Sequence, residues 1–285
     1  MKFYHLLIPF LSVSTLALYA QKHTETISRK LTFTNESSNY VLFVENINGA
    51  VEISPYSGNE ILLEANLEII GEDATALAQG KKELEVISRA KKDSILIFIS
   101  CPAISYYRYD SRRNYNFDSR KIDYDFKVDM HLKVPENVLS DVSTINNGDI
   151  VINNYKGAIK AANVNGNVLL TDVGEVVKAT TVNGDIEVIT SNNPSANANF
   201  NTINGDIKVH YPNNLGAKIG FKSFNGKFYT DFKVVERLPV KVIKTKSHEN
   251  ENIYKLEGYT TIKIGEGGPE IRFETFNGDV YVSSK

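Results

Sequence analysis

One short phrase, Asn-Gly followed in most copies by Asp, recurs along this chain and constrains what it can fold into. In its fullest form it reads TTVNGDIEVIT, over residues 180–190. The glycines of five consecutive copies stand 18, 18, 21 and 21 residues apart, and a fixed step near twenty is typical of stacked repeats. These glycines are Gly148, Gly166, Gly184, Gly205 and Gly226, with a later copy at Gly278 and an early one at Gly49.

Each copy predicts a strand, a tight turn and a second strand. Asn-Gly readily accepts positive φ at consecutive turn positions, and β-branched or aromatic residues flank it. A glycine about every 18 residues among Val, Ile and Thr contradicts helical propensity. Further glycines at Gly157 and Gly174 lie midway between the first turns. Two short strands and two corners therefore make one coil.

Apolar residues recur at fixed places in every unit and predict a shared interior. The residue before Asn is apolar, as are the residues two and four positions after Gly, and period-two alternation places one face inside. Stacked coils are separated by a strand spacing of roughly 4.8 Å, so the asparagines should form a file whose side-chain amides bond to one another. We expect this file to contain Asn165, Asn183, Asn204 and Asn225. The prediction is an all-β, single-chain β-solenoid (β-helix-like) with short coils of 18–21 residues.

The aspartates that follow the glycines raise the question of a metal site. Asp149, Asp185, Asp206 and Asp279 would line up in such a stack, but Asn167 and Lys227 occupy the same column and dilute its charge. The nonapeptide with two adjacent glycines found in calcium-binding repeats does not occur here. We therefore expect no metal ion and assign the aspartates to the turns.

The remaining chain divides into a strand-rich N-terminal portion, residues 21–135, and the repeat region, residues 136–285. Residues 27–70 alternate as strands, residues 73–84 form the one plausible helix, and residues 84–100 form a hairpin. Pro135 closes the last strand of this portion. An insertion at about 231–270 interrupts the repeats, with an exposed hairpin and a glycine turn.

A Tyr/Arg loop at residues 104–121 is the best candidate for ligand contact. Aromatic residues interleaved with Arg stack on sugars or bases and bind anionic groups. The alternative is an exposed hairpin whose arginines serve solvation, because nearby aspartates almost balance them. The candidate residues are Tyr106, Tyr107, Arg108, Tyr109, Arg112 and Arg113.

The N-terminal twenty residues predict export. Lys2, an apolar run and the small Ala20 are typical of a cleavable secretory signal, with cleavage before Gln21. The mature formal charge of −3 provides no basic field for nucleic acid. No later stretch approaches eighteen uninterrupted apolar residues, so we expect no integral membrane segment after cleavage. The expected address is secreted, or periplasmic and cell-envelope.

Catalysis is not expected. No His stands near Cys101, another His or an acidic pair at metal-ligand spacing, and no G-x-S-x-G pattern occurs. No cofactor is expected either. Exposed carboxylates on a β-helix nevertheless make a polysaccharide-cleaving enzyme the serious enzymatic alternative.

The repeated TxNGDIxV units, with VPENVLSDVSTINNGDI before them and IGEGGPEIRFETFNGDVYV after them, resemble the bacterial "putative adhesin" family of secreted β-strand-repeat proteins. The resemblance implies a β-solenoid, a cell-envelope or secreted address, and no known catalytic residues. The expected function is a non-enzymatic protein that presents an extended surface to a glycan or an envelope protein. A structural or stress-response accessory of the envelope is a second alternative.

Overall fold

The structure is a computed structural model that describes residues 20–34, 39–109, 112–246, 252–256 and 258–285. Side chains of residues 106–115 and 243–257 are outside this description. The described chain is all-β apart from helix α1 (Ala74–Glu83) and one short 3₁₀ turn (Ser119–Lys121), which confirms the all-β part of the expected fold class. The expected signal, residues 1–20, falls almost entirely outside the described residues.

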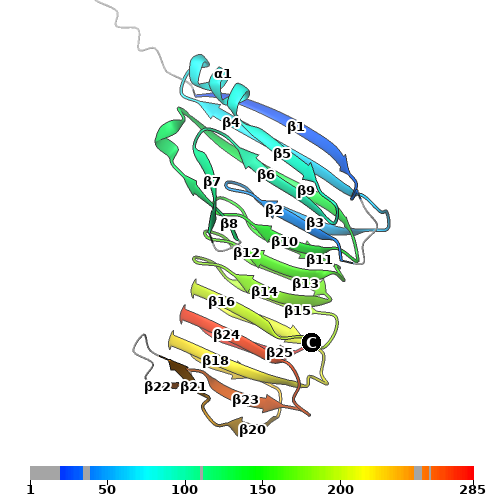
Figure 1. Cartoon of the computed structure of the whole chain (residues 1–285), viewed down its shortest axis with the longest axis vertical. Coiled ribbons are helices and arrows are strands. Elements are labelled where there is room, and N and C mark those ends of the chain that lie inside the picture. The colour runs from blue at the N-terminus through cyan, green and yellow to red at the C-terminus, as the bar shows by residue number, and fades with distance from the viewer. Residues whose placement is uncertain (1–19, 35–38, 110–111, 247–251, 257) are drawn as a thin grey trace, which may run out of the picture.

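Two long sheets face each other along the molecule (Figure 1). The ten-stranded sheet, called sheet A, runs in the order β1 (Gln21–Leu31), β4 (Ile61–Gly71), β9 (Tyr124–Pro135), β3 (Val51–Tyr56), β11 (Ile150–Asn153), β13 (Val168–Val173), β15 (Ile186–Thr190), β17 (Ile207–Tyr211), β25 (Val280–Ser284), β19 (Phe228–Thr230). The eleven-stranded sheet, sheet B, runs in the order β20 (Val234–Leu238), β23 (Thr260–Ile264), β18 (Ala217–Asn225), β24 (Glu270–Asn277), β16 (Ala198–Asn204), β14 (Glu175–Thr180), β12 (Ala158–Ala162), β10 (Leu139–Ser143), β2 (Val41–Glu45), β6 (Ser94–Ser100), β5 (Glu85–Ala90).

Each Asn-Gly turn is a corner at which the chain leaves sheet B and enters sheet A. Equivalent strands of successive coils pair in parallel, so Ile150 is aligned with Val168, Val168 with Ile186, and Ile186 with Ile207. All four of these side chains are buried between the sheets. The arrangement is solenoid-like, and the columns two and four positions after Gly form its interior as expected.

The coils do not stack in sequence order. Strands β24 and β25, which hold the last Asn-Gly copy, lie between the β16–β17 coil and the β18–β19 coil in both sheets. Phe273 on β24 consequently stacks on Phe200 of β16, with ring centroids 5.1 Å apart. The insertion between residues 231 and 270 supplies β23 and β20, which continue sheet B beyond β18 in antiparallel pairing.

The N-terminal residues are built into the same stack. Strands β2 and β3 flank Asn48-Gly49 and pair with β10 and β11, so the first coil precedes a long excursion, as expected. The excursion adds β9 and β4 to sheet A and the β5–β6 hairpin to sheet B. Helix α1 is capped at Asp73, whose side chain accepts a hydrogen bond from the Ala76 amide at 2.8 Å. The helix and the hairpin predicted from sequence are both confirmed.

Two smaller hairpins complete the described chain. Strands β7 (Ile104–Tyr109) and β8 (Arg112–Phe117) form one, and β21 (Val242–Lys246) and β22 (Asn252–Leu256) form the other within the insertion. Gly265 and Gly267 both adopt positive φ in the glycine turn that precedes β24, as expected. Among the described residues, none of the helical segments has the length and apolar content needed to cross a membrane.

Candidate binding surface

A file of hydrogen-bonded asparagine side chains runs along the Asn-Gly corner. Each Nδ2 donates to the Oδ1 of the preceding asparagine at 2.7 to 2.9 Å, which is the ladder expected from the repeat. Its order is Asn146, Asn165, Asn183, Asn204, Asn277 and Asn225. All four asparagines expected in the file belong to it, and Asn277 of the intercalated coil lies between Asn204 and Asn225. The file holds the coils in register and so fixes the spacing of every exposed side chain.

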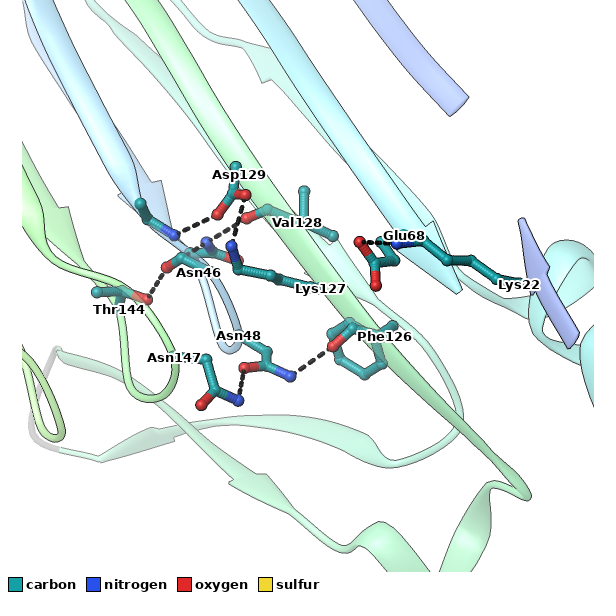
Figure 2. Close-up of polar contacts among 12 residues, drawn as sticks. Lys22, Asn46, Asn48, Glu68, Phe126, Lys127, Val128, Asp129, Thr144 and Asn147 are labelled. Carbon is teal, nitrogen blue, oxygen red and sulfur yellow. Dashed lines mark hydrogen bonds and ion pairs between the residues drawn. The ribbon is translucent and has the colours of Figure 1, made fainter. Parts of the chain in front are cut away.

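At the N-terminal end of the asparagine file, strand β9 takes the place of a further coil (Figure 2). The Asn46 side chain donates to the Val128 carbonyl at 2.8 Å, and Asn48 donates to the Phe126 carbonyl. Asn147 in turn donates to the Asn48 side chain at 2.7 Å. Backbone carbonyls of β9 therefore satisfy the amides that a preceding coil would otherwise bind.

The aspartates after the glycines form a second ladder, directed at the backbone. The Oδ1 of Asp185 accepts a hydrogen bond from the Asp206 amide at 2.8 Å, and Asp206 accepts from the Asp279 amide at 2.9 Å. Asp149 and Asn167 act in the same way on the coils that follow them. Each side chain thus satisfies an N–H at a corner of the next coil. Within the described chain no group of three His, Cys, Asp or Glu side chains is placed to hold a metal ion.

Close approach between coils explains the glycine of each corner better than positive φ does. A Cβ on Gly184 would lie 2.2 Å from the Gly166 carbonyl oxygen, and one on Gly205 would lie 2.0 Å from the Gly184 oxygen. Among the corner glycines only Gly49, Gly205 and Gly278 have positive φ, and among the asparagines directly before the corner glycines only Asn147 does, so no copy has positive φ at both positions. The expectation of positive φ at both turn positions is therefore wrong for every copy.

Polar residues two positions before the asparagines, all buried except Ser223, were not predicted from the sequence. The hydroxyls of Thr144, Thr181 and Thr202 donate to carbonyls of the glycines in the neighbouring coil at 2.8 to 3.1 Å. Asn163 makes the equivalent bond at 3.0 Å through its side-chain amide. The sequence shows these residues as Thr or Asn two positions before the asparagine of the file. They were overlooked because the neighbouring apolar columns were assigned to the interior.

The residue immediately before the asparagine is exposed in the three C-terminal coils, which corrects its assignment to the interior there, whereas Ile47 of the first coil is buried. Ile203 is 47 % exposed, Phe276 is 49 % exposed and Phe224 is 74 % exposed. The rings of Phe224 and Phe276 stack with centroids 4.8 Å apart and an interplanar angle of 6°. The half-buried Ile145, Val164 and Val182 occupy the same position in the earlier coils. An apolar ridge beside the asparagine file therefore becomes aromatic and exposed toward the C-terminal coils.

A second aromatic pair, of the exposed Tyr229 and the half-buried Tyr281, lies on the outer face of sheet A. Tyr281 and Tyr229 are aligned across β25 and β19, and their rings stack at 5.0 Å with an interplanar angle of 11°. Lys208 precedes Tyr281 in the same column. Tyr229 is 43 % exposed and stands on the last strand of sheet A, so one face of its ring has no neighbouring strand.

On the outer face of sheet B, side chains of these same coils contact one another. Lys222 is bonded to Glu274, which also accepts a hydrogen bond from the Tyr259 hydroxyl at 2.8 Å. The Lys222 bond is the main reason that the pKa of Glu274 lies below its usual range. The Arg272 guanidinium lies 5.1 Å from the centroid of the Tyr259 ring. Side chains of this face bind one another, whereas the tyrosine pair of sheet A is open to a partner.

The Tyr/Arg residues singled out in the sequence lie on the β7–β8 hairpin. Its backbone register pairs Tyr106 with Tyr115, Arg108 with Arg113, and Tyr109 with Arg112. The hairpin itself agrees with the sequence expectation. The side chains of Tyr106, Tyr107, Arg108, Tyr109, Arg112 and Arg113 fall outside the described part of the structure.

Comparison with known proteins agrees with the resemblance drawn from the repeats. Residues 136–223 match the family described as Toastrack DUF4097. A search of curated proteins found no match.

Three solved structures are similar over most of the chain. A "putative cell adhesion protein" of Clostridium sporogenes is 13 % identical, with a TM-score of 0.42, 94 % of this chain covered and 100 % of that one. A "putative adhesin" of Bacteroides fragilis is 9 % identical, with a TM-score of 0.32 and 92 % and 97 % coverage. A "putative lipid binding protein" of Parabacteroides distasonis is 12 % identical, with a TM-score of 0.27 and 91 % and 96 % coverage.

Proposed function

We propose that this chain is a non-enzymatic cell-envelope protein of the adhesin type, exported through a signal at residues 1–20. In this proposal it uses the side of its stacked 18–21-residue coils to bind a glycan or another protein. One observation carries the proposal. Among the described residues, every large hydrophobic side chain with high exposure lies between positions 203 and 276, and two of them, Phe224 and Tyr229, each stack on an aromatic ring of the intercalated coil.

Exposed aromatic side chains at the end of a rigid stack suit binding because little conformational freedom is lost on contact. Clustered apolar side chains on a folded surface generally mark an interaction site. Tyr229 and Tyr281 also carry hydroxyls, so they present an apolar ring and a polar edge together. The ladders at the corner fix these rings before any partner arrives, which reduces the entropic cost of binding.

A binding screen tests the proposal. The chain from residue 21 onward is applied to arrays of envelope glycans and to membrane-free envelope proteins, together with two double variants, Phe224→Ala with Phe276→Ala and Tyr229→Ala with Tyr281→Ala. We expect at least one double variant to lose a partner that the unaltered chain binds. Binding of every partner by both double variants at unaltered strength contradicts the proposal.

The Tyr/Arg hairpin is tested in the same screen. A triple variant with Ala at Tyr106, Tyr107 and Tyr109 reports on the hairpin, and circular dichroism shows whether each variant is folded. Unchanged binding by the folded triple variant removes the hairpin from the binding surface. Loss of binding by the triple variant alone moves the site to the hairpin.

A polysaccharide-cleaving enzyme is the second candidate, because one exposed level of sheet A carries acidic and basic groups together. The Nδ1 of His131 lies 3.0 Å from an oxygen of Glu52, and Glu64 is aligned with His131 on its other side. A carboxylate that orients an imidazole is a common arrangement for a general base. New reducing ends or unsaturated products from a polysaccharide, lost in His131→Ala, would establish this activity over the proposed binding role.

A further inference from the structure

A groove crosses the outer face of sheet A at the end remote from the aromatic pairs. It has a volume of about 580 Å³ and extends over strands β1, β4, β9, β3 and the end of β11. Its direction is across the strands, along the long axis of the sheet. The side chains on its two walls are exposed or half-buried, and all of them belong to the described part of the chain.

Strand register builds the two walls from alternate residues. On one wall, Ser28 is aligned with Glu64, Glu64 with His131, and His131 with Glu52. On the other wall, offset by two residues on each strand, Lys30 is aligned with Leu62, Leu62 with Lys133, and Lys133 with Ser54. Alternate residues of a strand are roughly 7 Å apart, which sets the distance between the walls at the backbone. Asn153 closes the second wall.

The walls carry opposite charges. Glu52 and Glu64 make the first wall acidic, and Lys30 and Lys133 make the second wall basic. Lys133 and Glu64 form no ion pair with any residue that the structure describes. Lys30 has only a 3.9 Å contact to Glu60, and its side chain is 76 % exposed. The basic groups of the second wall are therefore free to bind an external anion.

We propose that this groove binds a carboxylate-bearing oligosaccharide, with its chain lying across the strands. Its carboxylates pair with Lys30 and Lys133, and its hydroxyls donate to Glu52 and Glu64 and bond to Asn153. The inference names a ligand class for the binding protein proposed above. It rests on that proposal only for the binding role and uses a separate surface, so either can fail alone.

The lining of the groove selects this ligand over others. No Phe, Tyr or Trp side chain lines it, so a neutral sugar lacks the large ring face on which it usually stacks and an ionic contact must supply much of the affinity. The acidic wall opposes the dense phosphates of a nucleic acid. Lys30 and Lys133 are two strands apart, roughly 9.6 Å at the backbone, so a chain with repeated carboxylates reaches both and a single small anion does not.

Calorimetry with defined oligomers tests the inference. Hexagalacturonate is the probe, and monomeric galacturonate, neutral cellohexaose and a hexaglutamate peptide are the comparisons. We expect hexagalacturonate to bind more tightly than all three, and its affinity to fall as salt is raised. A double variant, Lys30→Gln with Lys133→Gln, should weaken binding by about tenfold, since exposed ion pairs contribute up to ~1 kcal/mol each.

Two controls make the result specific. Lys208→Gln, on the same face but beside the tyrosine pair, should leave hexagalacturonate binding unchanged, as should Phe224→Ala with Phe276→Ala. Equal binding by the unaltered chain and the Lys30, Lys133 variant overturns the inference, as does equal binding of hexaglutamate or no binding of hexagalacturonate. Partners that depend on the aromatic pairs would then still support the proposed function.

Discussion

Asn277 donates a hydrogen bond to Asn204 at 2.8 Å, although 73 residues separate them in the sequence. The two residues are aligned on neighbouring parallel strands, β24 and β16. Asn225, which is closer to Asn204 in sequence, bonds to the other side of Asn277. The chain therefore forms the β18–β19 coil at the end of the stack and continues through the insertion. It then returns, so that its last coil, β24–β25, lies inside the stack.

This return gives the C-terminal coil two neighbours and leaves the β18–β19 coil at the end of sheet A. The last coil contacts Phe200 through Phe273 and bonds to both adjacent corners. The exposed rings of Phe224 and Tyr229 stand on the outer coil, each stacked on a residue of the intercalated one. The candidate binding surface therefore depends on correct placement of the final twenty residues.

Removal of one asparagine from the file should destabilise the fold in proportion to the bonds lost. Asn204→Ala removes two side-chain hydrogen bonds, one to Asn183 and one from Asn277. We expect a loss of about 1–2 kcal/mol in the free energy of unfolding, measured in urea. Asn225→Ala is the matched control because it removes one bond, and it should cost about half as much. Equal losses in the two variants would contradict the ladder.

A side chain at a corner glycine should be far more harmful than one at a glycine within a strand. In Gly184→Ala the new Cβ would lie 2.2 Å from the backbone oxygen of Gly166, so the two coils must separate. We expect a loss of about 3 kcal/mol or failure to fold. In Gly220→Ala the nearest atom is 3.5 Å away, on Tyr259, and stability should change by less than about 0.5 kcal/mol. Equal thermal midpoints for the two variants would refute the close approach.

Alkaline pH should weaken the fold through Tyr155. This side chain is fully buried, and burial raises its pKa to about 12, above the value near 10 of an unfolded chain. Its hydroxyl is bonded to Ser140 at 3.1 Å and to the Val138 carbonyl. As pH rises through 10 the unfolded state releases this proton while the folded state keeps it, so stability falls between pH 10 and 12, by up to about 2–3 kcal/mol.

A Phe variant isolates this contribution, because burial also raises the pKa values of Tyr124 and Tyr211. Tyr155→Phe should be less stable than the unaltered chain at pH 8, since it loses the buried hydrogen bonds. Its stability should then fall less steeply in alkali, so the difference between the two proteins narrows toward pH 12. A constant difference across this range would show that Tyr155 does not contribute.

The repeat made much of the interior predictable. The alternation around Asn-Gly placed Ile150, Val168 and Ile186 in one buried column, and the asparagine file followed from the strand spacing. The position of the last coil was not predictable in this way. The copies at Gly226 and Gly278 have the same local sequence pattern as the others, and this pattern does not specify which coil stacks on which.

The surface was less predictable than the interior for a physical reason. The residue before Asn is apolar in every copy, yet from Ile145 onward it is half-buried or exposed, because Thr or Asn two positions before the asparagine takes the inner place and bonds to the adjacent coil. The groove was also not visible in the sequence. Its walls bring together residues 28–30, 52–54, 62–64, 131–133 and 153, whose alignment depends on strand register that no local pattern specifies.

Disulfide trapping in the corner file tests the stacking order most directly. Asn204→Cys with Asn277→Cys places two thiols on adjacent strands, within the Cα separation of 4.4–6.8 Å usual for a disulfide. Asn204→Cys with Asn225→Cys places them two strands apart, roughly 9.6 Å, with the intercalated coil between them. Peptide mapping after mild oxidation should find the 204–277 disulfide and no 204–225 disulfide. Efficient formation of the 204–225 disulfide in the folded protein would contradict the intercalated coil.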